Sequence, residues 1–128
     1  MLRRLLILFV LLFTVLPAVS SQTISKDIIS AFEKGDSKKL SEHLNHNLEL
    51  NILGKQQMVS RNQATRLLKE FFENHPPKSF KVTYEGTKQG SKYGIGELKT
   101  IDSKFRVNLY FISQDKEILI YNLIIEIV

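Results

Sequence analysis

The sequence predicts an α+β fold in which helices pack on a curved antiparallel sheet of four to six strands. Residues 61–74 repeat apolar side chains at three- and four-residue spacing, as expected for a helix with one buried face. Beyond Pro76 and Pro77, four segments alternate apolar and polar residues and are separated by short turns. Strands joined by such short turns are antiparallel, so the second half of the chain is expected to form a meander.

The first residues predict export. Two arginines precede an uncharged apolar run from Leu5 to Leu16, and small residues follow Pro17. This order is typical of a secretory signal peptide, and the run is shorter than the ~20 residues that span a bilayer as a helix. We therefore expect residues 1–21 to be a signal peptide and residues 22–128 to be one soluble domain, periplasmic or extracellular.

Composition excludes several classes of partner and anchor. Cleavage before Ser21 or Gln22 removes Arg3 and Arg4, which lowers the formal charge from +5 to +3. Basic residues alternate with acidic ones, whereas a nucleic-acid surface gathers them on one face, so no nucleic acid is expected as a partner. The chain has no cysteine, which excludes disulfides and a lipid-modified thiol. We expect no stable membrane anchor and no cofactor.

The first half of the domain is expected to contain two short helices and a strand hairpin. The apolar spacing of Ile24, Ile28, Ala31 and Phe32 predicts a helix that ends at Gly35. Asp36 is expected to cap a second helix running through Leu40 and Leu44. Alternation at Leu48, Leu50 and Ile52 predicts a strand, with a turn at Gly54 and Lys55 and a short return over residues 57–59.

The long helix has a predicted start, buried face and end. Ser60 and Gln63 have the spacing of a capping box, and Pro76 cannot continue a helix because it has no amide hydrogen. The apolar stripe comprises Ala64, Leu67, Leu68, Phe71 and Phe72. This stripe is expected to cover one face of the sheet.

Four strands are expected after the long helix, at Ser79–Lys88, Lys92–Thr100, Lys104–Ser113 and Glu117–Ile127. Strict alternation would place Tyr84 on the face of Phe80, and Tyr121 on the face of Leu123. The last strand is apolar on both faces, since Ile118, Ile120 and Ile124 occupy the other one. Such a strand is central in a covered sheet or part of an interface, and we expect a homodimer through the outer sheet face.

Ligand-pocket candidates lie on the predicted strands: Tyr84, Tyr93, Glu97 and Tyr121. A carboxylate facing an apolar cavity has a raised pKa and can act as a base, and a tyrosine hydroxyl can donate to a ligand. The favoured interpretation is that Glu97 pairs with a nearby lysine in water and that the tyrosines lie in the core or at its rim. Gly94 and Gly96 indicate a bulge or bend in the same strand.

No catalytic constellation and no metal site is expected. His43 and His46 are spaced to share a face at the end of the second helix, but zinc requires three or four ligands and no third partner is evident. His75 is interpreted as a residue that ends the long helix.

A family resemblance rests on motifs spread from Asp27 to Glu126. They are DIISAFEKGDSKKLSEHL, SRNQATRLLKEFFENHPPKSF, YEG at Tyr84 to Gly86, SKYGIGEL at Ser91 to Leu98 and FRVNLYF at Phe105 to Phe111. In this order the chain resembles the nuclear transport factor 2-like, or cystatin-like, cone, and within it the exported bacterial family called domain of unknown function 4783. The resemblance implies the fold and an exported setting, and it implies no activity.

Three functions stay open at this point. The first is a non-enzymatic exported domain that binds a small apolar ligand or a protein partner through its cone or sheet face. The second is an isomerase, dehydratase or cyclase acting on a small hydrophobic substrate, with Glu97 or a histidine as the base. The third is a structural role in the cell envelope. An interior of the cone filled by the side chains of Phe71, Phe72, Phe105 and Leu123 would argue against the enzymatic function.

Overall fold

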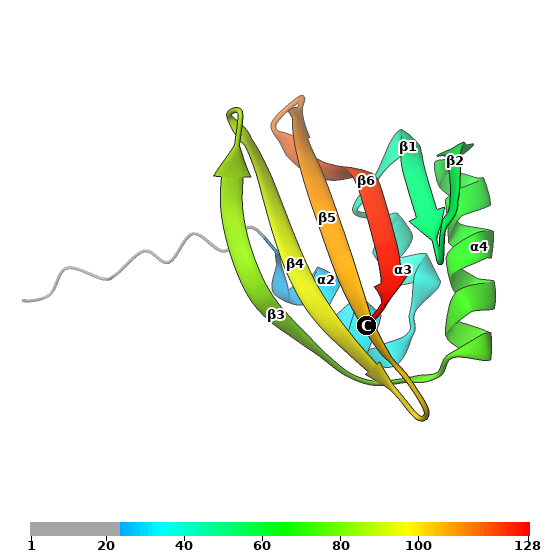
Figure 1. Ribbon diagram of the computed structural model, residues 1–128. Coiled ribbons are helices and arrows are strands. Elements are labelled where there is room, and N and C mark those ends of the chain that lie inside the picture. The colour runs from blue at the N-terminus through cyan, green and yellow to red at the C-terminus, as the bar shows by residue number, and fades with distance from the viewer. Residues whose placement is uncertain (1–23) are drawn as a thin grey trace, which may run out of the picture.

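A computed structural model describes residues 24–128, which form three helices and one six-stranded sheet (Figure 1). The α+β prediction is confirmed. The predicted signal peptide and its cleavage sites lie outside the described residues. Within residues 24–128, no helix is both long and apolar enough to cross a membrane.

The helices begin and end at the predicted signals. The bounds are α2 Lys26–Lys34, α3 Ser37–Ser41 and α4 Arg61–Asn74. Ser25, Asp36 and Ser60 are the N-caps, each with a side-chain oxygen that accepts a hydrogen bond from the amide three residues later. Gly35 ends α2 in the left-handed conformation, with φ 65°. The second helix is shorter than predicted, because it ends at Ser41 and Leu44 already belongs to the next strand.

The strands are β1 Leu44–Ile52, β2 Lys55–Ser60, β3 Pro77–Lys88, β4 Ser91–Thr100, β5 Lys104–Gln114 and β6 Glu117–Ile127. Their order in the sheet is β2-β1-β6-β5-β4-β3. All neighbours are antiparallel except β1 and β6, which are parallel. The apolar last strand is therefore internal to the sheet, between β1 and β5.

Three hairpins turn through only two residues. The turn residues are Leu53-Gly54, Gln89-Gly90 and Asp115-Lys116, and both residues of each pair have positive φ. Two successive residues in the left-handed conformation are characteristic of a type I′ turn. The twist of this turn matches that of the strands it joins. These turns fix the strand register and hence the residues that share a face.

All helices lie on one face of the sheet, which we call the inner face (Figure 1). The α4 stripe covers β1 and β2 and reaches β5, where the rings of Phe71 and Phe105 meet edge to face at 5.2 Å. At the other end α2 covers β3, and Phe32 stacks on Phe80 at 4.7 Å. The long helix therefore covers only part of the inner face, and α2 covers the rest.

Candidate functional site

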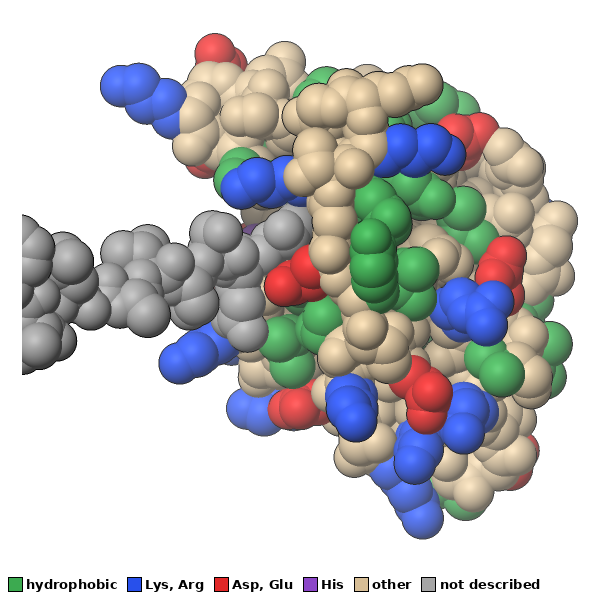
Figure 2. Space-filling view, turned by 60° about the vertical axis from the view of Figure 1, so that its left-hand side comes forward, with side chains coloured by type: hydrophobic (Ala, Val, Ile, Leu, Met, Phe, Trp, Pro, Cys, Tyr) green, Lys and Arg blue, Asp and Glu red, His purple; other side chains and the backbone are tan. Residues whose placement is uncertain are grey.

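Four tyrosines form a row across the opposite face of the sheet, which we call the outer face. Tyr84, Tyr93, Tyr110 and Tyr121 come from β3, β4, β5 and β6, one from each strand. Successive ring centroids are 5.6, 5.9 and 6.5 Å apart. We call these residues the tyrosine row. Figure 2, turned toward the β3 side, shows hydrophobic side chains near the middle of the surface, with basic and acidic side chains around them.

Two irregularities in strand pairing place the ends of this row. The register of β3 and β4 shifts between Val82 and Tyr84, and that of β5 and β6 shifts opposite Tyr121. Each extra residue reverses the alternation beyond it. Tyr84 and Tyr121 are consequently 52% and 36% exposed on the outer face. The expectation that they share faces with core residues is wrong for this reason.

The shift between β5 and β6 also determines which apolar residues of β6 lie on each face of the sheet. Ile120, Leu123 and Ile125 are fully buried in the core. Leu119 pairs with Ile112 on the outer face, where it is buried outside the core cluster. Strict alternation, which would place Leu119 on the face of Leu123, therefore does not hold across this shift. Apolar contacts continue from the tyrosine row to the β5–β6 hairpin.

Gly86 makes room for two rings of the row. A Cβ atom at this position would lie 2.9 Å from the Tyr84 ring and 3.1 Å from the Tyr93 ring. Both rings therefore lean over bare backbone on β3. The outer face depends on this glycine as well as on the tyrosines.

The tyrosine rings of the row lie at different angles to one another. The Tyr93 and Tyr110 rings are stacked, with an interplanar angle of 21°, and the Tyr84 and Tyr93 rings are tilted by 36°. A hydrogen bond with Tyr84, desolvation and the adjacent phenols raise the pKa of Tyr93 above its ordinary value of about 10. The row thus forms a line of phenol groups that interact with one another.

Replacing Tyr84 by phenylalanine tests this interaction. The ring packing is kept and the hydroxyl is lost, so the pKa of Tyr93 should fall toward its ordinary value. The neutral phenol is favoured in the folded protein, so its contribution to stability is present below pH about 10 and is lost as pH rises through the raised pKa. NMR titration of labelled tyrosine rings measures the change. Tyr121→Phe is the control, and an unchanged Tyr93 pKa in Tyr84→Phe would contradict the interaction.

Polar residues continue the row onto the remaining strands. The register aligns Tyr93, Tyr110, Asn122, Glu49 and Met58 on neighbouring strands. The Glu49 carboxylate accepts hydrogen bonds from the side-chain amides of Asn122, at 3.4 Å, and Gln56. Met58, at the β2 edge, is 70% exposed. The outer face therefore changes from aromatic at β3 to polar at β1.

Glu97 lies on the outer face, away from the core. Its carboxylate is 3.5 Å from the Lys104 ammonium, and its side chain is 36% exposed. The prediction of a solvated carboxylate paired with a lysine is confirmed. Glu97 does not face the helices, so it is not the cavity-facing base that the enzymatic alternative requires.

The interior of the cone is filled by side chains. Phe71, Phe72, Phe105 and Leu123 are all buried in the core. A Cβ on Gly94 would lie 2.4 Å from the Ile24 side chain, and one on Gly96 would lie 2.1 Å from the Phe80 ring. These glycines therefore admit larger side chains to the inner face. The predicted bulge falls opposite Gly96, on β3.

The histidines are not arranged as a metal site. His43 lies between α3 and β1 and His46 lies within β1, so the two do not share a helix face as expected. Among residues 24–128, no three His, Asp or Glu side chains gather as metal ligands. His75 is the C-cap of α4, and its amide donates to the Phe71 carbonyl oxygen at 2.8 Å. Its predicted position at the helix end is confirmed.

Comparison with known proteins gives a family and a fold. The family described as "Domain of unknown function (DUF4783)" matches residues 25–126. The crystal structure of a DUF4783 family protein from Bacteroides ovatus is 30% identical, with 84% of this chain and 98% of that chain covered and a TM-score of 0.79. The crystal structure of a DUF4783 family protein from Bacteroides fragilis is also 30% identical. It covers 82% of this chain and 99% of its own, with a TM-score of 0.78.

A more distant structure shares the fold alone. An NTF-2-like protein of unknown function from Silicibacter pomeroyi is 12% identical, with 80% of this chain and 88% of that chain covered and a TM-score of 0.60. No curated protein matches the chain.

Proposed function

The chain belongs to the DUF4783 family and has the nuclear transport factor 2-like fold, as its motifs predict, and on this basis we propose that it is an exported, non-enzymatic binding module. Its working surface is the outer face of the sheet. Its occupant is a second copy of the same chain. The observation that carries the proposal is the tyrosine row.

The chemistry of the tyrosine row favours a protein surface over a flat sugar or nucleotide ring. A stacking platform offers coplanar ring faces, whereas the rings of Tyr84 and Tyr121 are tilted by 36° and 58° from those of their neighbours in the row. Ring edges with hydroxyls suit the mixed apolar and polar contacts of protein interfaces, where tyrosine is enriched. Ile112 and Tyr121, which are 39% and 36% exposed, extend the apolar area.

The dimensions of the outer face are sufficient for a stable dimer. Six strands span roughly 25 Å, and ten residues of strand extend roughly 33 Å. Because β1 and β2 are short, the usable face is roughly 600 to 800 Å² by these spacings. A standard interface buries about 800 Å² on each partner, so this area is adequate but not generous.

The charges of the outer face also permit self-association. Glu97 pairs with Lys104, and Arg106 lies 3.8 Å from Glu126. Strand register also places Lys81 and Lys99 on this face, so the charged end carries four basic and two acidic side chains, and the proposed two-fold arrangement keeps its two copies apart. In a two-fold dimer the same patch serves both partners, which a row of like residues satisfies.

Native mass spectrometry of protein purified from its own host tests the proposal. We expect a dimer at micromolar concentration, and a mass showing that the leader has been removed before Ser21 or Gln22. Combined Tyr93→Asp and Tyr110→Asp substitutions should yield a monomer, because they would bring like charges together in the interface. Ile101→Ser is the control, since Ile101 is 68% exposed in the β4–β5 turn.

Folding of each variant is checked by circular dichroism, so that a monomer is not confused with an unfolded chain. A wild-type protein that remains monomeric at about 100 µM, well above micromolar affinity, would contradict the proposed dimer. Capture of a different envelope protein by the same face would instead support the structural alternative. Turnover of a small hydrophobic substrate would support the enzymatic one.

A further inference from the structure

Two tyrosines of the row bring their ring edges together over Gly86. The register sets Tyr84 opposite Ile95 and Gly86 opposite Tyr93, so the two tyrosines are diagonal neighbours across β3 and β4. A Cβ atom on Gly86 would lie 2.9 Å from the Cε1 atom of Tyr84 and 3.1 Å from the Cε1 atom of Tyr93. The two Cε1 atoms are therefore within about 6 Å of each other.

The Cε carbons are the ring positions at which oxidised phenols join. Loss of one electron and one proton leaves a radical shared between the oxygen and the ring carbons beside and opposite the C–O bond. The opposite carbon of tyrosine carries the link to the backbone, so only the Cε carbons are free to react. Two such radicals form a C–C bond, and the protons leaving these carbons restore both hydroxyls. The two electrons and two protons removed overall reduce one hydrogen peroxide to two waters.

The geometry favours this pair over the other neighbours in the row. Tyr84 and Tyr93 have the shortest distance between ring centroids, 5.6 Å, against 5.9 and 6.5 Å for the next two pairs. Among the glycines of residues 24–128, Gly86 alone would place a Cβ against tyrosine rings. Its missing side chain is the space in which the two ring edges meet.

Tyr84 also gives an oxidant access to the pair. Its side chain is 52% exposed, and it lies on β3, at the edge of the sheet. Tyr93 is half-buried between Tyr84 and Tyr110, which limits the motion of its ring. Holding two reacting atoms close together is what makes a reaction within one chain faster than a reaction between chains.

We propose that Tyr84 and Tyr93 are an oxidative modification site, at which hydrogen peroxide and a one-electron oxidant of the haem peroxidase class join the two Cε1 atoms within one chain. The new bond ties the edge strand β3 to β4 across Gly86. It thereby fixes one end of the outer face. This modification goes beyond the proposed dimer and does not require it.

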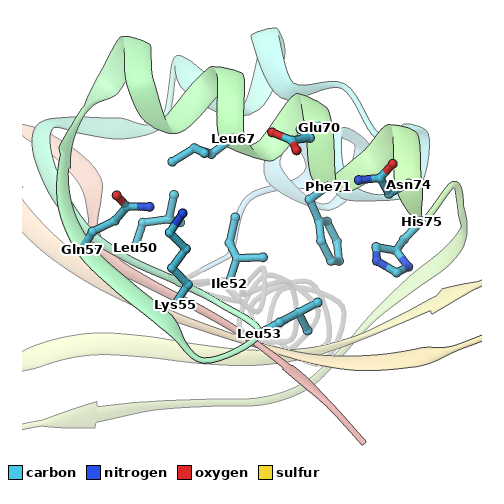
Figure 3. Close-up of a pocket in the computed structure, with 10 residues that line it drawn as sticks. All are labelled: Leu50, Ile52, Leu53, Lys55, Gln57, Leu67, Glu70, Phe71, Asn74 and His75. Atoms are coloured by element: carbon cyan, nitrogen blue, oxygen red, sulfur yellow. The ribbon is translucent and has the colours of Figure 1, made fainter.

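The helical side of the sheet provides an internal reference for the reaction. A pocket of about 210 Å³ lies there between α4 and the β1–β2 hairpin (Figure 3). Figure 3 shows Leu67 above Leu50 and Ile52. No tyrosine lines this pocket, and its lining residues belong to neither β3 nor β4. The NMR signals of Leu50 and Leu67 should therefore stay in place when the cross-link forms.

Treatment of the purified protein with hydrogen peroxide and a haem peroxidase tests the proposal. We expect a product that has lost two hydrogen atoms and still migrates as a single chain on a denaturing gel. Cleavage after lysine and arginine places the four tyrosines in separate peptides, at residues 82–88, 93–99, 107–116 and 117–128. Mass spectrometry should find the first two of these peptides joined.

Three variants test the geometry. Tyr84→Phe removes one phenol and should lower the yield of linked single chains at least about fivefold. Tyr121→Phe, the matched control, removes a phenol from the other end of the row and should leave the yield unchanged. Gly86→Ala keeps all four phenols but displaces the Tyr84 ring, so the yield should fall at least about threefold. Circular dichroism checks that each variant is folded.

The reaction is run at two protein concentrations, because the proposed dimer would cover the same face. At about 50 nM, below micromolar affinity, the product comes from separate chains and tests the cross-link alone. A lower yield at about 100 µM would support the dimer, and an equal yield would count against the dimer only.

Four results at the lower concentration would overturn the proposed site. They are a main link between Tyr93 and Tyr110, links only between chains, equal yields in wild type and Gly86→Ala, and no coupling where free tyrosine couples under the same conditions.

Discussion

Replacing Phe32 by alanine is expected to remove about 3 to 5 kcal/mol from the free energy of unfolding. Phe32 is completely buried, stacks on Phe80 at 4.7 Å and meets Phe72 edge to face at 6.1 Å. It thereby connects α2 with both β3 and α4. Truncation leaves a cavity among three elements, and α2 has nine residues and little stability of its own. Urea denaturation with linear extrapolation measures the loss.

Two comparisons make this expectation specific. Phe32→Leu keeps most of the volume and should cost less than about 1.5 kcal/mol. Ile101→Ala, at an exposed turn residue, should change stability by less than about 0.5 kcal/mol. A loss below 1 kcal/mol for Phe32→Ala would mean that α2 contributes little to the folded state.

Gly96→Ala is expected to destabilise the protein by about 1 to 3 kcal/mol. The added Cβ would lie 2.1 Å from the tip of the Phe80 ring, which cannot move freely because it is stacked on Phe32. The ring must shift, and the aromatic cluster must shift with it. Thermal unfolding should show a decrease of roughly 4 to 8 °C for each kcal/mol lost.

Gly86→Ala is the matched substitution on the opposite face. Its Cβ would lie nearest the Tyr84 ring, which is 52% exposed and can swing into solvent, so its effect on stability should be small. Combining Gly96→Ala with Phe80→Leu should cost less than the sum of the two single changes, because the clash is then removed. Strict additivity would show that Phe80 is not the residue displaced.

Much of the architecture could be predicted because local signals agreed with the final fold. The helix Arg61–Asn74 has the bounds expected from Ser60 at its start and the prolines beyond its end. The last strand, Glu117–Ile127, also agrees with its prediction. Two-residue turns leave neighbouring strands no arrangement except an antiparallel one. Periodicity and turn chemistry are properties of a few adjacent residues, so sequence alone displays them.

Features that depend on pairing between distant residues were not predictable in the same way. The parallel contact of β1 with β6 joins residues more than 70 positions apart, such as Glu49 and Asn122. The positions of the bulges near Tyr84 and Tyr121 depend on how each strand pairs with the residues of its neighbouring strand. A single extra residue is enough to exchange the faces of the sheet.

The candidate sites show the same division. The sequence marks Tyr84, Tyr93 and Tyr121 as candidates, yet their alignment with Tyr110 in one row follows only from strand register and from the space at Gly86. The pocket beside α4 was missed, because the packing of a helix on a hairpin is also a contact between distant residues.

The position of β6 between β1 and β5 has a consequence for biosynthesis. β6 follows the other five strands along the chain yet lies between β1 and β5, so a nascent polypeptide cannot assemble this sheet until β6 has been synthesised. The export proposed above requires an unfolded chain before translocation, and a late closing step delays premature compaction. Early termination would leave β1 and β2 without their link to the meander.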